Sequence, residues 1–418
     1  MEARARAEDG DLPDGGDLTV TDVDTEAPGG PLTGTRIVAL EQAVAMPFCS
    51  FILAELGAEV IKIERPGRGD VVRGWDHVAR GLSSGFVAFN VGKRDVAIDL
   101  GSEQGRAVVR RLVRSADAFL ENFSPGVAAR LGLSEADLRA ENPALVYCSL
   151  SGYGQTGPYR DVKAYDLLVQ GESGVLLSNG TPDAPAKVGL PITDLIGGST
   201  AAIAVLSALV ARSASGTGTY LDVAMLDAVA PWLSYFPHHY WHEGVEPPRT
   251  GMRHQYLSPY GPYLAQDGVY VNLVVASEHD WLRLCEQVLD APELVDDPRF
   301  ATIDARRRHR DELEALVERR IVALPSKIWI DRLASAELPY GEVRTMEKVL
   351  EHPQLLARQM FVEAASPVGT LPVVRFPLGA PSVERRLPGL GQDTDDVLRS
   401  VGYESEEIDA FRTQGVVA

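Results

Sequence analysis

The sequence predicts an α/β protein, in which a large domain holds a Rossmann-like parallel sheet and a smaller domain is also α/β. Three observations support this prediction. Short apolar runs alternate with helical runs over residues 36–150, and the 418-residue chain is too long for one ordinary core. The composition, with 45% hydrophobic and 24% charged residues, is that of a globular protein. Parallel strands need helical crossovers, so both faces of the sheet should be covered.

Short β-branched, apolar runs indicate the strands. The first is 36–40, a helix follows to Leu56, and the second strand is 59–63. The same pattern predicts strands at 95–100, 118–121 and 145–150, and helices at 102–115 and from Ser134. The turn after the first strand, Glu41-Gln-Ala-Val-Ala-Met-Pro47, lacks the GxGxxG pattern that brings a backbone close to a pyrophosphate. NAD and FAD are therefore not expected.

The composition changes in the middle of the chain. From Ser151 to Gly198 the sequence is rich in Gly, Pro, Ser and Thr, and loops of this length usually carry function. The next run, 195–211, is apolar but short for a bilayer span and rich in small residues, which favours a buried helix over a membrane helix. An aromatic linker and a second set of strands and helices follow. We expect a large domain over 33–227, and a linker with the small domain over 228–344.

Charge and cysteine content exclude several classes of function. The formal net charge of -19 disfavours binding to nucleic acids and to anionic membranes. Residues 1–32 carry part of this charge and are predicted to be a disordered acidic leader, without the features of a secretory or mitochondrial signal. The cytoplasm is therefore the expected location. Cys49, Cys148 and Cys285 are widely spaced and without CxxC pairing, which is typical of reduced thiols.

Nine segments of the chain, in order, resemble the family III CoA-transferases of the CaiB/BaiF type, which include formyl-CoA transferases and α-methylacyl-CoA racemases. The resemblance extends from about residue 34 to the C-terminus. The segments are Glu41-Gln-Ala43, Leu56-Gly-Ala-Glu-Val-Ile-Lys-Ile-Glu-Arg-Pro66, Arg73-Gly-Trp75, Gly92-Lys-Arg94, Glu121-Asn-Phe-Ser-Pro-Gly126, Arg130-Leu-Gly132, Ser151-Gly-Tyr-Gly154, Lys163-Ala-Tyr165 and Gly189-Leu-Pro-Ile-Thr-Asp194.

The resemblance implies a CoA-transferase that works on acyl-CoA and a carboxylic acid, without a prosthetic group. It also implies an interlocked homodimer, in which the C-terminal segment 345–418 returns to the large domain. The family's nucleophilic aspartate corresponds to Asp194, and Gln42 is the second catalytic position. The family's CoA-contacting positions correspond to Ala43, Arg65, Ile98, Asn122, Phe123, Arg130 and Lys163. Arginine and lysine suit the CoA phosphates, and Gln42 and Asn122 can donate hydrogen bonds near the thioester or the pantetheine amides.

Asp194 has two interpretations. As a nucleophile, its carboxylate would attack the acyl-CoA carbonyl, form a mixed anhydride and release the CoA thiolate, so that one difficult exchange becomes several easier steps. As a structural residue, an aspartate before an apolar run is a good helix N-cap. Both roles are compatible, because a helix N-terminus also favours an ionised carboxylate.

Two other functions remain open. A racemase of the same family would need a histidine where this chain has Tyr165, and tyrosine is a poor proton shuttle near neutral pH. A non-catalytic CoA-binding subunit would need no nucleophile. Metal binding is not expected, although His238 and His242 are four residues apart, since aromatic residues lie between them.

The acceptor acid is predicted from the segment Thr250-Gly-Met-Arg-His-Gln-Tyr-Leu-Ser-Pro259, which lacks the glycine-rich loop of the formyl-CoA branch. This departure puts oxalate and formate in doubt as acceptors. Arg253, His254 and Tyr256 could hold a second carboxylate, which favours a dicarboxylic acid, although ordinary loop polarity explains these residues equally well. Tyr165 is a further candidate for substrate contact.

Overall fold

The computed structural model describes residues 29–379 and 383–418, so the predicted leader lies almost wholly outside the described residues. The chain forms two compact units. Unit 1 comprises the described residues up to Leu150, with Gly198–Asp222 and Met360–Ala418, and unit 2 comprises Ser151–Gly197 and Val223–Gln359.

This division differs from the predicted domain ranges in three places. Residues 223–227 were expected in the large domain but belong to unit 2. The Gly-rich segment 151–197 belongs to unit 2 rather than to the large domain. The reason is its pairing: the Gly251 N–H donates to the Gly180 carbonyl, and the Arg249 side chain donates to the Thr181 carbonyl. The C-terminal part of unit 1 begins at Met360, whereas the sequence placed that return at residue 345.

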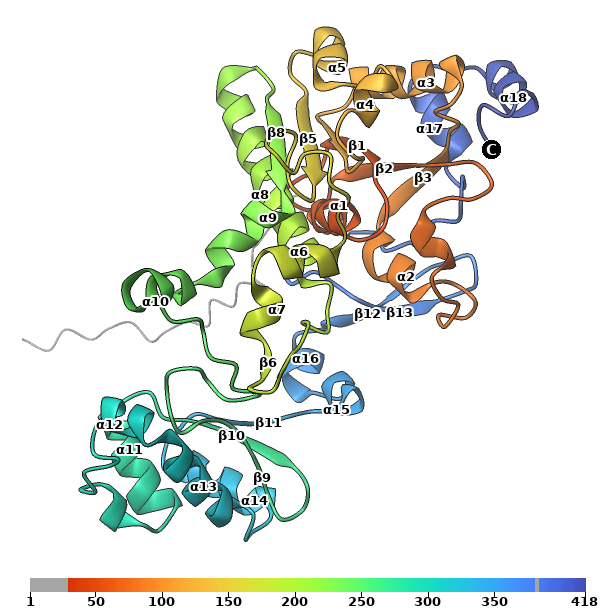
Figure 1. Cartoon of the computed structure of the whole chain (residues 1–418). Helices are drawn as coiled ribbons and strands as arrows, with labels where there is room; N and C mark the ends of the chain where they lie inside the picture. Colours follow the sequence, from red (N-terminus) through yellow and green to blue (C-terminus); the bar gives the residue numbers. More distant parts are fainter. Residues whose placement is uncertain (1–28, 380–382) are drawn as a thin grey trace, which may run out of the picture. The chain divides into compact units, whose positions relative to one another are not determined.

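Unit 1 is built on a six-stranded sheet in the order β3-β2-β1-β4-β5-β8 (Figure 1). Strands β1 to β5 pair in parallel. The strands are β1 (Arg36–Leu40), β2 (Glu59–Glu64), β3 (Lys93–Ala97), β4 (Ala118–Glu121), β5 (Val146–Ser151) and β8 (Tyr220–Ala224). The chain moves to one side of β1 for β2 and β3 and to the other side for β4 and β5. In open α/β sheets, ligands bind at the carboxyl ends of the strands beside such a reversal.

Helices and a small hairpin complete unit 1. They are α1 (Ala45–Glu55), α2 (Ser84–Asn90), α3 (Glu103–Arg114), α4 (Val127–Arg130), α5 (Glu135–Glu141), α17 (Thr394–Ser400), α18 (Ser405–Thr413) and the strands β12 (Phe361–Ala364) and β13 (Leu371–Val374). The long helix α8 (Ile192–Ser215) begins in unit 2 and belongs to unit 1 from Gly198 onward. Ser102 and Ser134 cap α3 and α5 by accepting hydrogen bonds from the first-turn N–H groups of Gly105 and Asp137.

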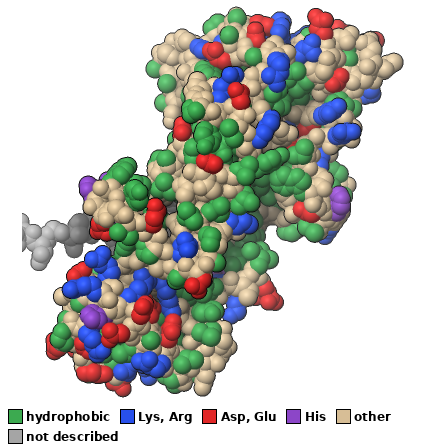
Figure 2. Space-filling view, viewed as in Figure 1, with side chains coloured by type: hydrophobic (Ala, Val, Ile, Leu, Met, Phe, Trp, Pro, Cys, Tyr) green, Lys and Arg blue, Asp and Glu red, His purple; other side chains and the backbone are tan. Residues whose placement is uncertain are grey.

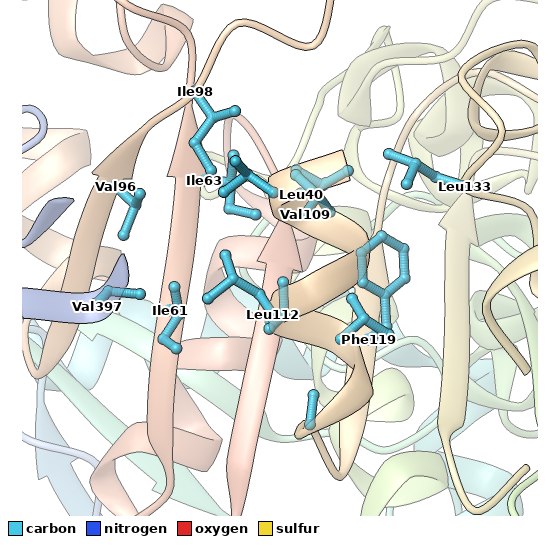
Figure 3. Close-up of a cluster of buried hydrophobic side chains, with 14 of the residues drawn as sticks. Leu40, Ile61, Ile63, Val96, Ile98, Val109, Leu112, Phe119, Leu133 and Val397 are labelled. Atoms are coloured by element: carbon cyan, nitrogen blue, oxygen red, sulfur yellow. The ribbon is translucent and has the colours of Figure 1, made fainter. Parts of the chain in front are cut away.

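The main core of unit 1 lies between α3 and one face of the sheet (Figure 3). Alternate strand residues such as Leu40, Ile61 and Phe119 meet Val109 and Leu112 of α3. Helix α1 instead packs against β2 and β4. The central strands β1 and β4 are thus covered on both faces, which explains their continuous hydrophobic runs in the sequence.

Helix α8 is long and apolar enough to cross a membrane by length and composition. Within unit 1, however, Ala201, Ala202 and Val205 are buried along one side. A side chain at Gly198 would collide with the Ala45 carbonyl of α1, so glycine permits close packing here. The opposite side of the helix leaves Ile203 exposed.

Unit 2 contains a three-stranded antiparallel sheet in the order β11-β10-β9. Its strands are β9 (Tyr260–Leu264), β10 (Tyr270–Val274) and β11 (Tyr340–Glu342), and the remaining elements are α6 (Asp166–Glu172), α7 (Val175–Ser178), β6 (Gly180–Thr181), β7 (Ala184–Pro185), α9 (Met225–Val229), α10 (Phe236–Glu243), α11 (Glu278–Arg283), α12 (Ile303–Arg308), α13 (Arg310–Ile321), α14 (Ser326–Ser335), α15 (Met346–Leu350) and α16 (Pro353–Ala357). Figure 2 shows basic and acidic side chains interspersed over the α11–α14 end, and ion pairs such as Arg299 with Glu312 lie there.

Candidate active site

A cleft of about 740 Å³ opens in unit 1 at the carboxyl ends of the parallel strands. Its walls come from the ends of four neighbouring strands: Leu40–Gln42 spans the end of β1, Ile63–Arg65 spans the end of β2, Ile98–Gly101 follows β3 and Phe123 follows β4. This is the position at which α/β sheets hold their ligands, and the volume suits a ligand of cofactor size.

Four of the residues predicted from the sequence line this cleft: Gln42, Arg65, Ile98 and Phe123. Ile98 is buried and Phe123 packs against the main core, so both present apolar surface from a fixed position. Arg130 lies at the end of α4, exposed, and is not among the cleft residues.

Ala43 and Asn122 do not line the cleft but belong to the loop beside Gln42. The Gln42 N–H donates to Asn122 Oδ1 at 3.0 Å, and Asn122 Nδ2 donates to the Gln42 carbonyl at 2.9 Å. The Asn122 amide was predicted to donate to CoA, but here it holds the Gln42 backbone. Ala43 has a φ of 63°, in the left-handed region, which residues other than glycine rarely adopt.

Buried ion pairs fix the loop Glu41–Ala43 at the end of β1. Glu41 Oε1 is 2.7 Å from Lys93 Nζ and 3.5 Å from Lys62 Nζ, and Lys62 Nζ is 2.8 Å from Asp70 Oδ2. Burial alone would raise the pKa of Glu41, but the two lysines hold it below its usual value. Burial lowers the pKa of Lys93 to about 8, against the opposing charge of Glu41.

The cleft also includes Arg68, which the sequence did not single out. Arg68 lies three residues after Arg65, and both side chains are exposed. Two guanidinium groups on one wall can bind an anionic ligand such as a phosphate. The signal for Arg68 was its position in Arg65-Pro-Gly-Arg68, next to a residue that the resemblance already marked.

Asp194 lies in unit 2 and is the third residue of α8. It is therefore inside the first turn and is not the N-cap, so that structural interpretation is wrong. Asp166 of α6 fixes the turn instead, since its Oδ1 accepts hydrogen bonds from the Thr193 N–H and from Thr193 Oγ1, both at 2.9 Å. Asp166 Oδ2 also accepts from Gln170 Nε2 at 2.7 Å.

The surroundings of Asp194 favour its neutral form. Burial, and secondarily the charge of Asp166, raise the pKa of Asp194 from 3.8 to about 7. Among residues 29–379 and 383–418, no lysine, arginine or histidine forms an ion pair with this carboxylate. A carboxyl group with a pKa near neutrality is more basic than an ordinary aspartate, and strongly shifted groups cluster at functional sites.

Lys163 and Tyr165 precede α6 in unit 2. Tyr165 is the residue before the first turn of α6, and 73% of its surface is exposed. Lys163 is also exposed. Through Asp166, the segment that carries these residues is joined to the turn that carries Asp194.

The three predicted acceptor residues form a cluster that is largely occupied by protein partners. Arg253 pairs with Glu318 at 2.8 Å and with Glu314 at 3.4 Å, and its guanidinium lies 3.5 Å from the centre of the Tyr263 ring. Two carboxylates thus already compensate this charge, which weakens Arg253 as a site for a substrate carboxylate.

His254 and Tyr256 are also held within unit 2. The Tyr256 and Leu257 N–H groups donate to His254 Nδ1, both at 3.1 Å, so Nδ1 is unprotonated. Burial, together with Arg310, lowers the pKa of His254, which keeps the ring neutral near pH 7. Tyr256 stacks on His239 with ring centres 3.9 Å apart. The other ring nitrogen, Nε2, lies 3.4 Å from the Tyr235 hydroxyl, so the N–H of the neutral ring already has a protein partner.

The histidines of α10 do not form a metal cluster. The rings of His238 and His242 stack with centres 6.1 Å apart. In the part of the chain that the structure describes, no group of three or more His, Cys, Asp or Glu side chains is placed to hold a metal ion.

Comparison with known proteins identifies the family. Residues 32–394 match the family model described as "CoA-transferase family III". The chain belongs to this family and is a CoA-transferase, an enzyme whose substrates are CoA thioesters and carboxylic acids. This membership confirms the family predicted from the nine sequence segments.

Individual relatives are similar in sequence to this chain over most of their length. An acetyl-CoA:oxalate CoA-transferase from Acetobacter aceti is 36% identical over 82% of this chain and 89% of its own. A succinate–glutarate CoA-transferase from Agrobacterium fabrum is 35% identical over 91% and 97%. The crystal structure of a CAIB/BAIF family protein from Brucella suis matches with a TM-score of 0.78 and 34% identity, over 89% of this chain and 100% of that one. The predicted α/β fold with a large parallel sheet is thereby confirmed.

Proposed function

We propose that this CoA-transferase moves CoA from an acyl-CoA to a dicarboxylic acid, through covalent intermediates on Asp194. The observation that carries the proposal is the state of Asp194: a partly buried carboxyl group, without an ion pair in the described residues, whose pKa is raised to about 7. Such a group is more nucleophilic once ionised than an ordinary aspartate, because basicity and nucleophilicity rise together.

The reaction proceeds in four balanced steps. The Asp194 carboxylate attacks the thioester carbonyl, the carbon–sulfur bond breaks, and a mixed anhydride and the CoA thiolate result. The thiolate attacks the aspartyl carbonyl, so that the donor acid leaves and an aspartyl thioester forms. The acceptor carboxylate displaces the thiolate from this thioester and forms a second anhydride. Finally, the thiolate attacks the acceptor's acyl carbon, which gives the new acyl-CoA and restores the Asp194 carboxylate. Water must be kept from both anhydrides.

The cleft of unit 1 is proposed to bind CoA. Arg65 and Arg68 suit its phosphates, Ile98 and Phe123 offer apolar surface to the adenine, and Gln42 lies on the same wall. Arg130 and Lys163 remain predicted phosphate contacts, although neither is part of the cleft wall. CoA is thus a substrate, and the four steps require neither a metal nor a prosthetic group.

The proposed acceptor class rests on relatives rather than on Arg253. The relatives from Acetobacter aceti and Agrobacterium fabrum are named for oxalate and for succinate and glutarate, all of them dicarboxylic acids. Oxalate, which the sequence put in doubt, therefore belongs among the candidate acceptors, and formate has no such support.

An interlocked homodimer in the cytoplasm is proposed for the assembly. Large apolar side chains remain exposed in the single chain: Ile203 and Val210 on α8, and Trp232 and Trp241 around α10. Figure 2 shows apolar side chains at the α10 end of unit 2. Exposed apolar patches of this kind mark protein contacts. Sedimentation of the purified chain checks the prediction, and a monomer at micromolar concentration would contradict it.

Trapping of the intermediate tests the catalytic proposal. We expect that mixing with succinyl-CoA, followed by acid quench and mass spectrometry, places an adduct on Asp194 that hydroxylamine removes. Asp194→Ala should lower CoA transfer at least about 10³-fold while CoA still binds, because a lost nucleophile is not replaced by binding energy. Retained transfer in this variant would disprove the mechanism. Solvent deuterium at the α-carbon of a branched acyl-CoA, without CoA movement, would indicate a racemase instead.

A further inference from the structure

The loop Glu41–Ala43 is held in an unfavourable backbone conformation at the wall of the cleft. Ala43 has a φ of 63°, which places its Cβ close to backbone atoms and is rare outside glycine. Gln42, the residue before it, lines the cleft. If Ala43 relaxed to a negative φ, the chain direction would change at this point and the Gln42 side chain would leave its present position.

Asp70 holds Ala43 in this conformation. Asp70 Oδ1 accepts a hydrogen bond from the Ala43 N–H at 2.9 Å and another from the Val72 N–H at 3.1 Å. Its other oxygen, Oδ2, is 2.8 Å from Lys62 Nζ, and both of these side chains are buried. Its own N–H donates to Glu64 Oε2 at 2.6 Å. The carboxylate therefore has fixed partners on both oxygens and cannot turn away from the loop without breaking a buried ion pair.

The two supports of the loop act on neighbouring peptide groups. Asn122 holds the Gln42 N–H and carbonyl, and Asp70 holds the Ala43 N–H. Asn122 alone leaves Ala43 free to relax, because its hydrogen bonds end at Gln42. Asp70 is thus the contact that acts directly on the unfavourable φ.

We propose that Asp70, anchored on the buried Lys62, is a positioning residue for CoA transfer, which keeps Ala43 left-handed and so aims Gln42 into the CoA cleft. This inference rests on the proposed function, in which the cleft that Gln42 lines binds CoA. Asp70 needs no contact with the reacting atoms. Its contribution is orientation, and a misplacement of about 1 Å in a reacting site can cost about 10²-fold in rate.

Turnover per CoA-binding site is the measurement that separates positioning from folding. The number of sites is obtained by equilibrium binding of CoA, and kcat is divided by that number. We expect Asp70→Ala to lower kcat per site by at least roughly tenfold, while the KM for acyl-CoA changes by less than about threefold. Asp70→Asn should lose less than Asp70→Ala, because an amide oxygen can still accept from the Ala43 N–H.

A rescue variant tests the backbone argument directly. Glycine adopts positive φ without a steric cost, so the double variant Asp70→Ala with Ala43→Gly should recover part of the kcat that Asp70→Ala loses. A double variant that is no more active per site than Asp70→Ala overturns the role assigned to Ala43.

The matched control is Asp393→Asn. Asp393 is also a buried carboxylate of unit 1, which accepts from the Asp95 N–H at 2.9 Å and pairs with Arg386 at 2.5 Å, but it does not line the cleft. We expect its kcat per site to equal that of the wild type. If Asp70→Ala has the same kcat per site as this control, or if its whole loss lies in KM, the positioning role is refuted. Failure of the proposed function has another signature: the wild-type enzyme then shows neither CoA exchange nor an Asp194 adduct.

Discussion

The carboxylates beside the cleft of unit 1 and the carboxylate of Asp194 in unit 2 have charged neighbours of opposite sign. Glu41 and Asp70 are fully buried, and each is paired with a buried lysine. Asp194 is partly buried, and its charged neighbour is another carboxylate, Asp166. Glu41 and Asp70 are held in place by buried ion pairs, whereas burial and a neighbouring carboxylate raise the pKa of Asp194 to about 7. The contrast separates groups that shape a binding wall from a group that can react.

Among variants of these carboxylates, Glu41→Gln is expected to have the largest effect on the free energy of unfolding. The variant leaves Lys62 and Lys93 with less compensating charge, so the free energy of unfolding should fall by about 3–5 kcal/mol. Ser50→Ala is the control, since it removes the hydroxyl that donates to Glu41 and to the Pro47 carbonyl but leaves every charge in place, and it should cost about 1 kcal/mol. Urea unfolding of both variants provides the measurement.

The pH dependence of the Glu41→Gln deficit sharpens that test. The pKa of Lys93 is already lowered to about 8, and without Glu41 it falls further. A lysine with a lowered pKa in the folded state binds fewer protons there than in the unfolded state, so stability rises with pH. The deficit should therefore be larger at pH 6 than at pH 9, and equal deficits at the two values would contradict the assignment.

A smaller effect of opposite sign is expected from Asp194→Asn. In the wild type the pKa of Asp194 rises from 3.8 to about 7 on folding, so the folded state binds more protons and stability falls as pH rises between these values. The asparagine removes this loss. The free energy of unfolding of Asp194→Asn should therefore exceed that of the wild type by an amount that grows from about pH 4 to pH 7 and then stays constant. This difference should be on the order of 1–2 kcal/mol after allowance for partial exposure. Thermal unfolding at pH 5 and pH 8 checks the sign.

The smallest effect, a shift in the pH profile of CoA transfer, is expected from Asp166→Asn. The ionised, nucleophilic form of Asp194 increases as pH rises through about 7, so the wild-type rate should rise over the same range. Removal of the Asp166 charge should move this rise toward lower pH, but only part of the way, because burial is the larger cause of the shift. The asparagine oxygen can still accept from Thr193, so the turn is kept. An unchanged midpoint would show that Asp166 has only a structural role.

Local patterns predicted most strands of unit 1, although the strand expected at 95–100 begins at Lys93 and ends at Ala97. The strand 118–121 was placed at its observed bounds, and the helices that follow Ser102 and Ser134 begin where those side chains cap them. Both signals depend on neighbours in sequence. The division of the chain depends on distant partners instead, and nothing local indicated that the segment 151–197 would bond to residues near Arg249.

The candidate site was predictable where the resemblance marked individual residues. Gln42, Arg65, Ile98 and Phe123 come together in one cleft from the ends of four strands. The sequence missed Asp70, because its role depends on the conformation of Ala43 and not on any motif around it. Arg253 stays a prediction, and no local pattern indicated its ion pairs with two glutamates of α13, which lie more than 60 residues away in the sequence.

The discontinuity of unit 1 has a consequence for how the enzyme is made. Its residues come from three separate stretches of chain. The cleft segment that follows β3 is joined to the last of them, since the Asp99 N–H donates to the Val416 carbonyl and the Ala418 N–H donates to the Ala97 carbonyl. A ribosome therefore delivers all of unit 2 before this edge of the sheet can close. A chain cut short before residue 416 would lack both of these backbone hydrogen bonds to the segment that follows β3 and lines the cleft.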